Sequence, residues 1–147
     1  MTYTPVPLGA IYMELEFRRS VALAANARTS GLMDSTGSYI SKTVPTGKAF
    51  KVLYATFGGR TGASTGSDYS VDMEIKINSG YTSLGTAVQA SASANITGSV
   101  VGTVDAPLAK AEAGEVLRAS FKNLASSPGA LASSSHMVSI VGVLVDA

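Results

Sequence analysis

The sequence contains no cysteine, no tryptophan and only one histidine, His136. Without cysteine, neither disulfide bonds nor thiolate metal sites can hold the chain together. One histidine supplies a single imidazole, whereas zinc sites need several nitrogen or sulfur ligands, and no loop has the acidic spacing of a calcium-binding EF-hand. We therefore predict that the protein holds no metal ion and no cofactor.

Charged residues are scarce as well. They make up 14% of the chain, and the formal net charge is +1, with both signs spread along the sequence. Ordinary soluble domains contain about 25% charged residues. Nothing here builds the positive field that attracts nucleic acid or an anionic membrane, so we expect neither as a partner.

Alanine, serine, glycine and threonine take the place of charge, which leaves two explanations for the surface. Either it is simply neutral and rich in hydroxyl groups, or other protein chains cover much of it. We favour the second explanation, because a domain inside an assembly needs less charge to stay soluble.

Long apolar runs are missing too. The longest, residues 137–145, is interrupted by Ser139 and Gly142 and is far too short to cross a bilayer. The first residues lack a basic start followed by an apolar stretch, so we expect no signal peptide. The length of 147 residues fits one domain with a sizeable core.

The clearest pattern lies in residues 69–78, where five apolar residues alternate with five polar ones. The apolar set is Tyr69, Val71, Met73, Ile75 and Ile77, and the polar set is Ser70, Asp72, Glu74, Lys76 and Asn78. Successive side chains of a strand point to opposite faces, whereas a helix would mix the two sets. The pattern predicts an antiparallel strand with one buried face and one solvated, charged face, packed against a second apolar sheet.

Similar patterns recur along the chain, separated by turn residues. We predict strands at residues 10–17, 39–44, 48–57, 69–78, 81–88, 99–104, 116–122 and 136–145, with turns at 45–48, 78–80 and 113–115. Arg18 and Arg19 are expected to end the first strand, and residues 20–38, 58–67 and 125–135 are expected to be loops. About eight short strands and no convincing helix predict an all-β, antiparallel β-sandwich or small barrel.

Two of the predicted strands are apolar on both faces and should lie inside the sheet. In residues 48–57 we place Phe50, Val52, Tyr54 and Thr56 on one side, and residues 136–145 close the chain in the same way. The strand at 81–88 is expected to contribute Leu84 and Val88 to the core.

The order of turns and strands resembles the jelly-roll domain common in structural proteins of tailed bacteriophages. The matching phrases are Val44-Pro45-Thr46-Gly47-Lys48, Phe50-Lys51-Val52, residues 71–78 (close to a VDVxxN pattern), Ala113-Gly114-Glu115 and the final apolar strand at 137–145. The resemblance implies a jelly-roll β-sandwich over residues 39–147. Residues 1–38 would then form an N-terminal arm, a first strand and an irregular loop within the same single domain.

The resemblance also implies a place in the virion. Our first expectation is a capsid decoration (cement) protein on the capsid surface, an oligomer with a trimer favoured, whose partner is the major capsid protein. Residues 2–38 would reach onto the shell or a neighbour. The alternative is a tail-fibre or tail-tip module that binds a host surface glycan.

Catalytic chemistry finds little support in the residue types, so we predict that the protein is not an enzyme. His136 follows three serines, but no G-x-S-x-G turn and no orienting acid accompany it, and a surface histidine is expected. Asp72 and Glu74 lie about 6.5–7 Å apart along their strand, a spacing open to paired-carboxylate hydrolysis. Because Lys76 continues the same face, a solvated face or a salt bridge to a neighbouring subunit is the better interpretation, and Glu14 and Glu16 are interpreted in the same way.

The remaining motifs are weaker still. Asp68, beside Gly66 and Ser67, offers one carboxylate for calcium, and residues 58–62 look glycine-rich but lack the lysine and helix of a phosphate-binding loop. Asn95-Ile96-Thr97 is a glycosylation sequon that matters only after secretion. The tyrosines considered for glycan binding are scattered: Tyr3, Tyr12, Tyr39 and Tyr81.

Overall fold

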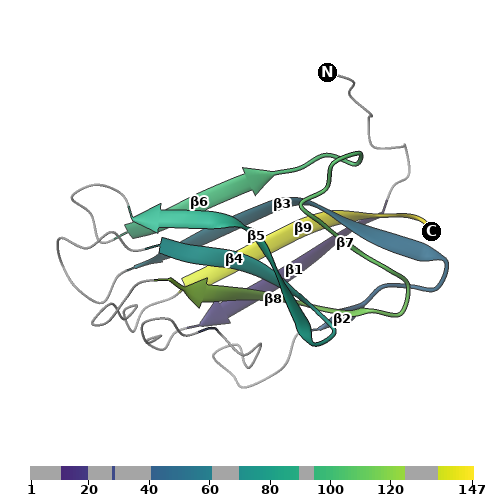
Figure 1. The fold of residues 1–147 in the computed structure, drawn as a ribbon, viewed down its shortest axis with the longest axis horizontal. Coiled ribbons are helices and arrows are strands. Elements are labelled where there is room, and N and C mark those ends of the chain that lie inside the picture. The colour runs from purple at the N-terminus through teal and green to yellow at the C-terminus, as the bar shows by residue number, and fades with distance from the viewer. Residues whose placement is uncertain (1–10, 20–27, 29–40, 61–69, 90–94, 125–135) are drawn as a thin grey trace.

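The computed structural model describes residues 11–19, 28, 41–60, 70–89, 95–124 and 136–147. Within these ranges every regular element is a β-strand (Figure 1). None of them is a helix long and apolar enough to cross a membrane. The prediction of an all-β chain is confirmed.

Nine strands follow one another along the described chain. They are β1 (Ile11–Arg19), β2 (Lys42–Thr43), β3 (Lys48–Arg60), β4 (Ser70–Ile77), β5 (Gly80–Gln89), β6 (Asn95–Val101), β7 (Ala109–Ala111), β8 (Val116–Asn123) and β9 (His136–Asp146). Most predicted strands are therefore confirmed in position. Several boundaries were wrong. β1 extends to Arg19 rather than ending at Phe17, and β3 continues through Gly58, Gly59 and Arg60, which were assigned to a loop. β6 runs over Asn95–Val101 rather than 99–104, and the short strand β7 was not predicted.

All strand pairs are antiparallel and join into one sheet with the order β1-β9-β3-β6-β5-β4-β8-β2, while β7 pairs with β3. The pairing is nested, since β1 pairs with β9, β2 with β8, β3 with β6 and β4 with β5. Two further pairs, β3 with β9 and β4 with β8, join these strand pairs into one sheet. Only Val88 and Gln89 of β5 join β6.

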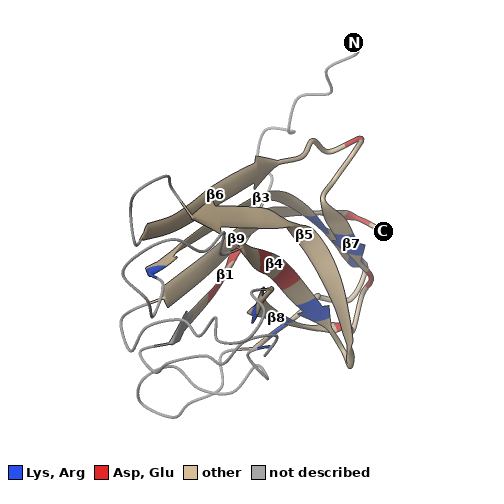
Figure 2. Cartoon of the chain, turned by 60° about the vertical axis from the view of Figure 1, so that its left-hand side comes forward, with Lys and Arg blue, Asp and Glu red and all other residues tan. Residues whose placement is uncertain are grey.

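The sheet curls until its far strands meet, which makes it nearly closed (Figure 2). The rings of Phe17 on β1 and Phe121 on β8 lie 5.9 Å apart between centroids, although these strands are not paired. Phe57 on β3 meets the same Phe121 ring at 5.0 Å in an edge-to-face contact. These aromatic contacts hold opposite walls of the sheet around one core.

The inward face of β4 follows the predicted alternation. Val71, Met73 and Ile75 are fully buried, and β8 contributes the buried Leu117, Ala119 and Phe121 beside them. β9 lies between β1 and β3, as expected for a strand that is apolar on both faces.

Two β-bulges change which residues face the core. The register of β3 against β9 shifts between Val52 and Tyr54, so Phe50 and Val52 point inward but Tyr54 points outward. The predicted common face of Phe50, Val52, Tyr54 and Thr56 is therefore wrong beyond Val52. One extra residue in a strand exchanges its two faces from that point on.

The second bulge lies in β5. Met73 pairs with Gly85 and Glu74 with Ser83, which leaves Leu84 without a directly opposite residue. Leu84 is buried as predicted, but Val88 is 58% exposed and Ala87 is buried in its place.

The three predicted turns are confirmed, and each contains a residue with positive φ. These residues are Gly47 (φ 76°), Asn78 (φ 55°) and Gly114 (φ 86°). Glycine and asparagine adopt this left-handed conformation at least cost. Asn78 also accepts a hydrogen bond from the Val116 amide at 3.0 Å, which ties the β4–β5 hairpin to the start of β8.

Candidate functional site

The outward face of β4 carries a row of charges, Asp72, Glu74 and Lys76, so that acidic and basic positions follow one another along the strand (Figure 2). Register places Lys122, Ser120 and Arg118 of β8 beside them on one side, and residues of β5 on the other. The sequence predicted that this face is solvated or salt-bridged to a neighbouring subunit.

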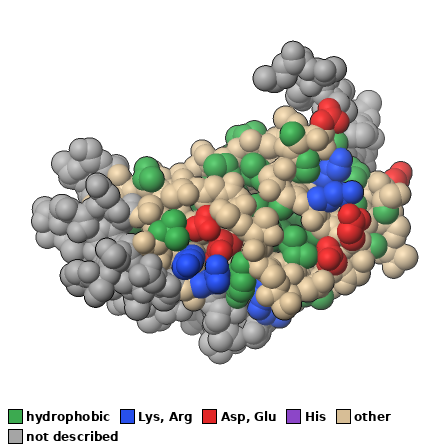
Figure 3. Space-filling view, in the orientation of Figure 1, with side chains coloured by type: hydrophobic (Ala, Val, Ile, Leu, Met, Phe, Trp, Pro, Cys, Tyr) green, Lys and Arg blue, Asp and Glu red, His purple; other side chains and the backbone are tan. Residues whose placement is uncertain are grey.

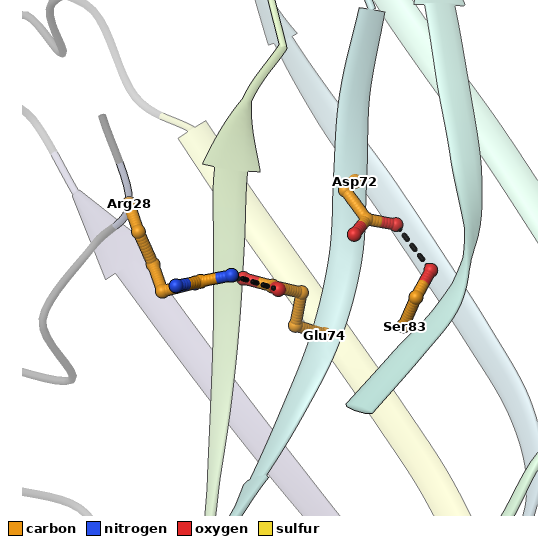
Figure 4. Close-up of polar contacts among 4 residues, drawn as sticks. All are labelled: Arg28, Asp72, Glu74 and Ser83. Carbon is orange, nitrogen blue, oxygen red and sulfur yellow. Dashed lines mark hydrogen bonds and ion pairs between the residues drawn. The ribbon is translucent and has the colours of Figure 1, made fainter. Parts of the chain in front are cut away.

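Glu74 departs from that prediction, because only 2% of the residue is exposed. Its two carboxylate oxygens accept hydrogen bonds from Arg28 Nε at 2.8 Å and Arg28 Nη2 at 2.9 Å (Figure 4). The salt bridge therefore forms within the chain rather than with a neighbouring subunit. A bidentate guanidinium satisfies a buried carboxylate better than a single ammonium does.

Arg28 reaches Glu74 from the far edge of β8. Its backbone forms an isolated antiparallel bridge with Lys122, and its side chain crosses the outer surface of β8 to β4 (Figure 4). The two charged residues are 46 positions apart in the sequence. Nothing in the residues around Glu74 indicates such a partner, so sequence patterns alone did not predict the pair.

Tyr81 completes the environment of the guanidinium. Arg28 Cζ lies 4.2 Å from the centroid of the Tyr81 ring, and Lys76 Nζ lies 5.3 Å from it. Both distances are within the range of a cation–π contact. We call Arg28, Glu74 and Tyr81 the arginine clasp.

The clasp also affects ionisation. The hydrogen bonds to Glu74 raise the pKa of Arg28, burial opposes this, and electrostatic interactions with Glu74, Tyr81 and Asp72 raise it further. The surroundings of Arg28 therefore favour its charged form.

Asp72 has a separate partner, since its Oδ1 accepts a hydrogen bond from the hydroxyl of Ser83 (Figure 4). A pair of hydrolytic carboxylates must both face the substrate. Here Glu74 has a side chain that is 3% exposed and bound on both oxygens by Arg28. The geometry is that of an ion pair within one chain, and Asp72 and Glu74 do not form a paired acid and base.

His136 was predicted to lie on the surface, and that prediction is wrong. It is the first residue of β9, it is fully buried, and its Nε2 lies 3.1 Å from the Arg60 carbonyl oxygen. A side chain at Gly59 would place its Cβ 2.7 Å from His136 Cδ2, so glycine makes room for the ring. The preceding serines, Ser133 to Ser135, lie outside the described residues.

The other residues that the sequence suggested for a functional site do not come together among the described residues. Glu14 is exposed, as predicted, and accepts a hydrogen bond from Ser139 Oγ at 3.1 Å, whereas Glu16 is half-buried. The sequon lies on β6, where Ile96 is buried. Outside the described residues lie Tyr3, Tyr39, Thr61, Gly62, Gly66, Ser67 and Asp68.

A second surface feature lies on the outward side of β9, β3 and β6. Register places nine residues there in three rows, and none of them is charged. The rows are Val141, Tyr54 and Val101; Ser139, Thr56 and Ser99; Met137, Gly58 and Thr97. We call these nine residues the neutral face. Tyr54 is 38% and Val101 74% exposed, which makes them large apolar side chains open to solvent.

Charged positions lie along one side of the neutral face and beyond its two ends. Glu14 and Glu16 lie beside it on β1, and Lys51 and Arg60 lie before and after it on β3. On the β6 side its neighbours are the uncharged Val88 and Gln89 of β5. On the side of the molecule that faces the viewer in Figure 1, charged side chains gather in two groups with uncharged surface between them (Figure 3). The sequence predicted a sparsely charged surface, but the bulge at Val52 and Tyr54 decides which residues form this face.

Among the described residues, no three histidine, aspartate or glutamate side chains come together in a way that would hold a metal ion. A comparison of the chain with protein families gives no match, and a search of curated proteins finds no significant relative.

Proposed function

We propose that this chain is a structural protein of a bacteriophage virion, a capsid decoration protein that assembles with copies of itself, as a trimer, on the outer shell. It would bind the major capsid protein and stabilise contacts between capsomers. The observation that carries the proposal is the neutral face, an uncharged surface with charged positions on its β1 side and beyond its ends on β3 and with polar or apolar positions on its β6 side. Protein–protein interfaces have this composition, because charge is depleted at the core of the contact and polar groups surround it.

The strand order supports a jelly-roll fold for this role. A jelly roll contains eight strands in two sheets, arranged as two Greek keys. Without β7, the eight remaining strands pair first with last, second with seventh, third with sixth and fourth with fifth. The orders β1-β9-β3-β6 and β2-β8-β4-β5 then correspond to the two sheets of such a sandwich, with β5 and β6 joined over a short stretch.

The low charge content supports the same role. Only 14% of the residues are charged, and Tyr54 and Val101 are exposed apolar side chains. Such a surface disfavours an isolated subunit in water and favours association with other chains. A stable interface buries roughly 800 Å² on each partner. The neutral face would be the centre of such a contact, and Glu14, Glu16 and Arg60 would lie at its edge.

Substitution of Val101 by glutamate tests the proposal. Val101 is 74% exposed, so Val101→Glu leaves the fold intact but puts a charge in the centre of the interface. Thr43→Glu, at an exposed position on β2, the last strand of the sheet order and outside the neutral face, is the matched control. We expect the wild-type and Thr43→Glu chains to sediment as oligomers and to bind capsids that lack the protein, and Val101→Glu to do neither. The proposal would be refuted if the wild-type chain is monomeric and does not bind such capsids.

A tail-fibre or tail-tip module that binds host glycan is the second candidate, and one observation favours it. Tyr12 is 59% exposed and Tyr54 38% exposed, and both point outward from the same side of the sheet, on β1 and β3. Exposed tyrosines offer the flat apolar surfaces on which sugar rings stack. A glycan array separates the two functions, since a glycan reader loses its signal in Tyr12→Ala and Tyr54→Ala, while a decoration protein shows no signal at all.

A further inference from the structure

We propose that the open edge of β6 pairs with the same edge of a second copy of this chain, in antiparallel orientation about a two-fold axis. The contact is made by the backbones of Ser99 and Val101. This inference goes beyond the proposed function and does not depend on it, because it rests on the edge of one strand and holds whatever surface the copies assemble on.

The edge is open because β5 leaves β6 after a short stretch of pairing. Only Val88 and Gln89 of β5 pair with β6, opposite Thr97 and Ile96. From there the two strands take different directions (Figure 1 and Figure 2). Among the described strands, none pairs with residues 98–101 on the side away from β3.

Two glycines allow β5 to cross the inner side of β6 instead of pairing with it. A Cβ on Gly85 of β5 would lie 2.4 Å from Val100 Cγ1, and a Cβ on Gly98 of β6 would lie 2.6 Å from Ala87 Cα. Gly98 and Val100 share their face of β6 with the buried Ile96, so this is the face toward the core. The crossing takes β5 under β6 and leaves the edge of β6 unpaired by β5.

The backbone groups at this edge belong to Ser99 and Val101. The Gly102 amide donates to a β3 carbonyl oxygen at 2.8 Å, and the Gly98 carbonyl oxygen accepts a hydrogen bond from a threonine hydroxyl of β3 at 3.1 Å. These two groups of the β6 chain therefore point toward β3. Since successive residues of a strand direct their N–H and C=O groups to opposite sides, Ser99 and Val101 direct theirs away from β3 and present two donors and two acceptors at the edge.

β6 also lacks the features that keep sheet edges from pairing with other chains. Natural edges are protected by charge, by proline or by shortness. Among the described strands at an edge, β1 carries Glu14 and Glu16, β2 has two residues and begins with Lys42, and β7 has three residues and contains Lys110. β6 contains no charged residue and no proline. An edge without such protection is suited to pairing with another strand.

A second copy fits this edge because the edge is complementary to itself. In antiparallel orientation, with Val100 opposite Val100 of the other copy, Ser99 of each copy lies opposite Val101 of the other. Each of these two pairs exchanges two hydrogen bonds, so the backbone groups at both edges are satisfied and no charges oppose each other. The fit ends where the open edge ends, since β5 pairs with Thr97 on one side and a turn begins at Thr103 on the other.

Pairing in this register joins the neutral faces of the two copies. Ser99 and Val101 are exposed members of the neutral face and lie on its β6 side. A two-fold axis through the paired edges keeps both neutral faces on the same side of the extended sheet, and the contact is isologous. The result is one continuous uncharged surface over β9, β3 and β6 of both copies.

Disulfide formation between single cysteines tests the pairing and its register. The chain has no cysteine, and both Ser99 and Val101 are exposed, so Ser99→Cys and Val101→Cys each carry one reporter thiol. Opposite residues in this register lie about 5.5 Å apart between Cα atoms, which a disulfide can span, whereas two copies of the same variant place these atoms more than about 7 Å apart. Under mild oxidation we expect the mixture of the two variants to form the mixed disulfide dimer at least about tenfold more than either variant forms its own dimer.

Thr97→Cys is the matched control, because Thr97 is exposed on the same face of β6 but its edge is occupied by β5. A mixture of Thr97→Cys with Val101→Cys should form no more dimer than either variant alone. If the Ser99→Cys and Val101→Cys mixture also forms no more dimer than its components, the copies do not pair in this way and the inference is overturned.

Amide hydrogen exchange of the wild-type chain provides a second measurement that needs no substitution. The amides of Ser99 and Val101 should exchange at least about tenfold more slowly at high protein concentration than at low concentration, because pairing protects them. The Thr97 amide, which faces β5, should exchange slowly at both concentrations. Fast exchange of Ser99 and Val101 at every concentration would overturn the inference but leave the proposed function in place, since capsid binding is measured separately.

Discussion

Removal of Arg28 gives the sharpest energetic test of the clasp. The variant Arg28→Ala leaves the Glu74 carboxylate, whose side chain is 3% exposed, without its two hydrogen bonds. Breaking a buried ion pair by removing one partner costs about 3–5 kcal/mol. Because the Arg28 side chain is 36% exposed, water can take part of its place, and we expect a loss of about 2 kcal/mol. In a chain of this size the loss lowers Tm by about 4–8 °C.

Substitution of Glu74 should lower the free energy of unfolding by less than Arg28→Ala does. This difference between the two variants identifies the buried carboxylate as the group that depends on its partner. In Glu74→Gln the neutral amide is less costly to bury and still accepts one hydrogen bond, while Arg28 regains water, so we expect a loss of about 1 kcal/mol. In the double variant the two losses should not add, because Glu74→Gln removes the charge that Arg28→Ala leaves unpaired. Urea denaturation of the four chains at low protein concentration measures the cycle.

Arg60→Ala controls for the removal of an exposed arginine and should change the free energy of unfolding by less than about 0.5 kcal/mol. If Arg28→Ala unfolds within that same margin of wild type, Glu74 does not depend on Arg28 and the interpretation of the clasp is wrong.

Three further predictions concern the fold. Gly142→Ala should lower the free energy of unfolding by about 3 kcal/mol, because a Cβ there would lie 2.4 Å from a β3 carbonyl oxygen. Gly58→Ala should be tolerated, because no atom lies within 4 Å of a Cβ at that position; thermal melts compare the two variants. Ile75→Asp should not fold at all, because Ile75 is fully buried and the new charge has no partner; circular dichroism would show this. The hydrogen bond from Lys48 lowers the pKa of Asp146 below 3.8, so its stabilising effect is present above that pH and disappears as the pH falls below it; Lys48→Met should return the pKa to the ordinary value in an NMR titration.

The sequence predicted the elements whose residue types alternate without interruption. β4 and β8 are examples, since Met73 and Phe121 occupy the buried face that the pattern assigned to them. The turns at Gly47 and Gly114 were equally predictable, because a positive φ restricts the choice of residue.

The bulges were not predictable from such patterns. Phe50, Val52 and Tyr54 form a regular apolar alternation, yet the shift after Val52 turns Tyr54 outward. A bulge adds one residue to a strand without requiring a particular side chain, so the alternation looks the same on both sides of it. For this reason the neutral face appears only once the register is known.

The clasp and the buried histidine depended on contacts between distant parts of the chain. Glu74 appeared to belong to a solvated face because its partner, Arg28, lies 46 residues away. His136 appeared to belong to a serine loop, although its place was set by Gly59 and Phe121 on other strands. Burial of a polar residue depends on what packs against it, and its immediate sequence neighbours carry little of that information.

The proposal that this chain is a subunit of a phage shell is tested most directly by electron cryomicroscopy of a particle that carries it. We predict that Tyr54 and Val101 lie in a contact with another protein chain, with β9, β3 and β6 turned toward that contact. A reconstruction in which these strands face solvent, with the subunits joined elsewhere or standing alone, would contradict it.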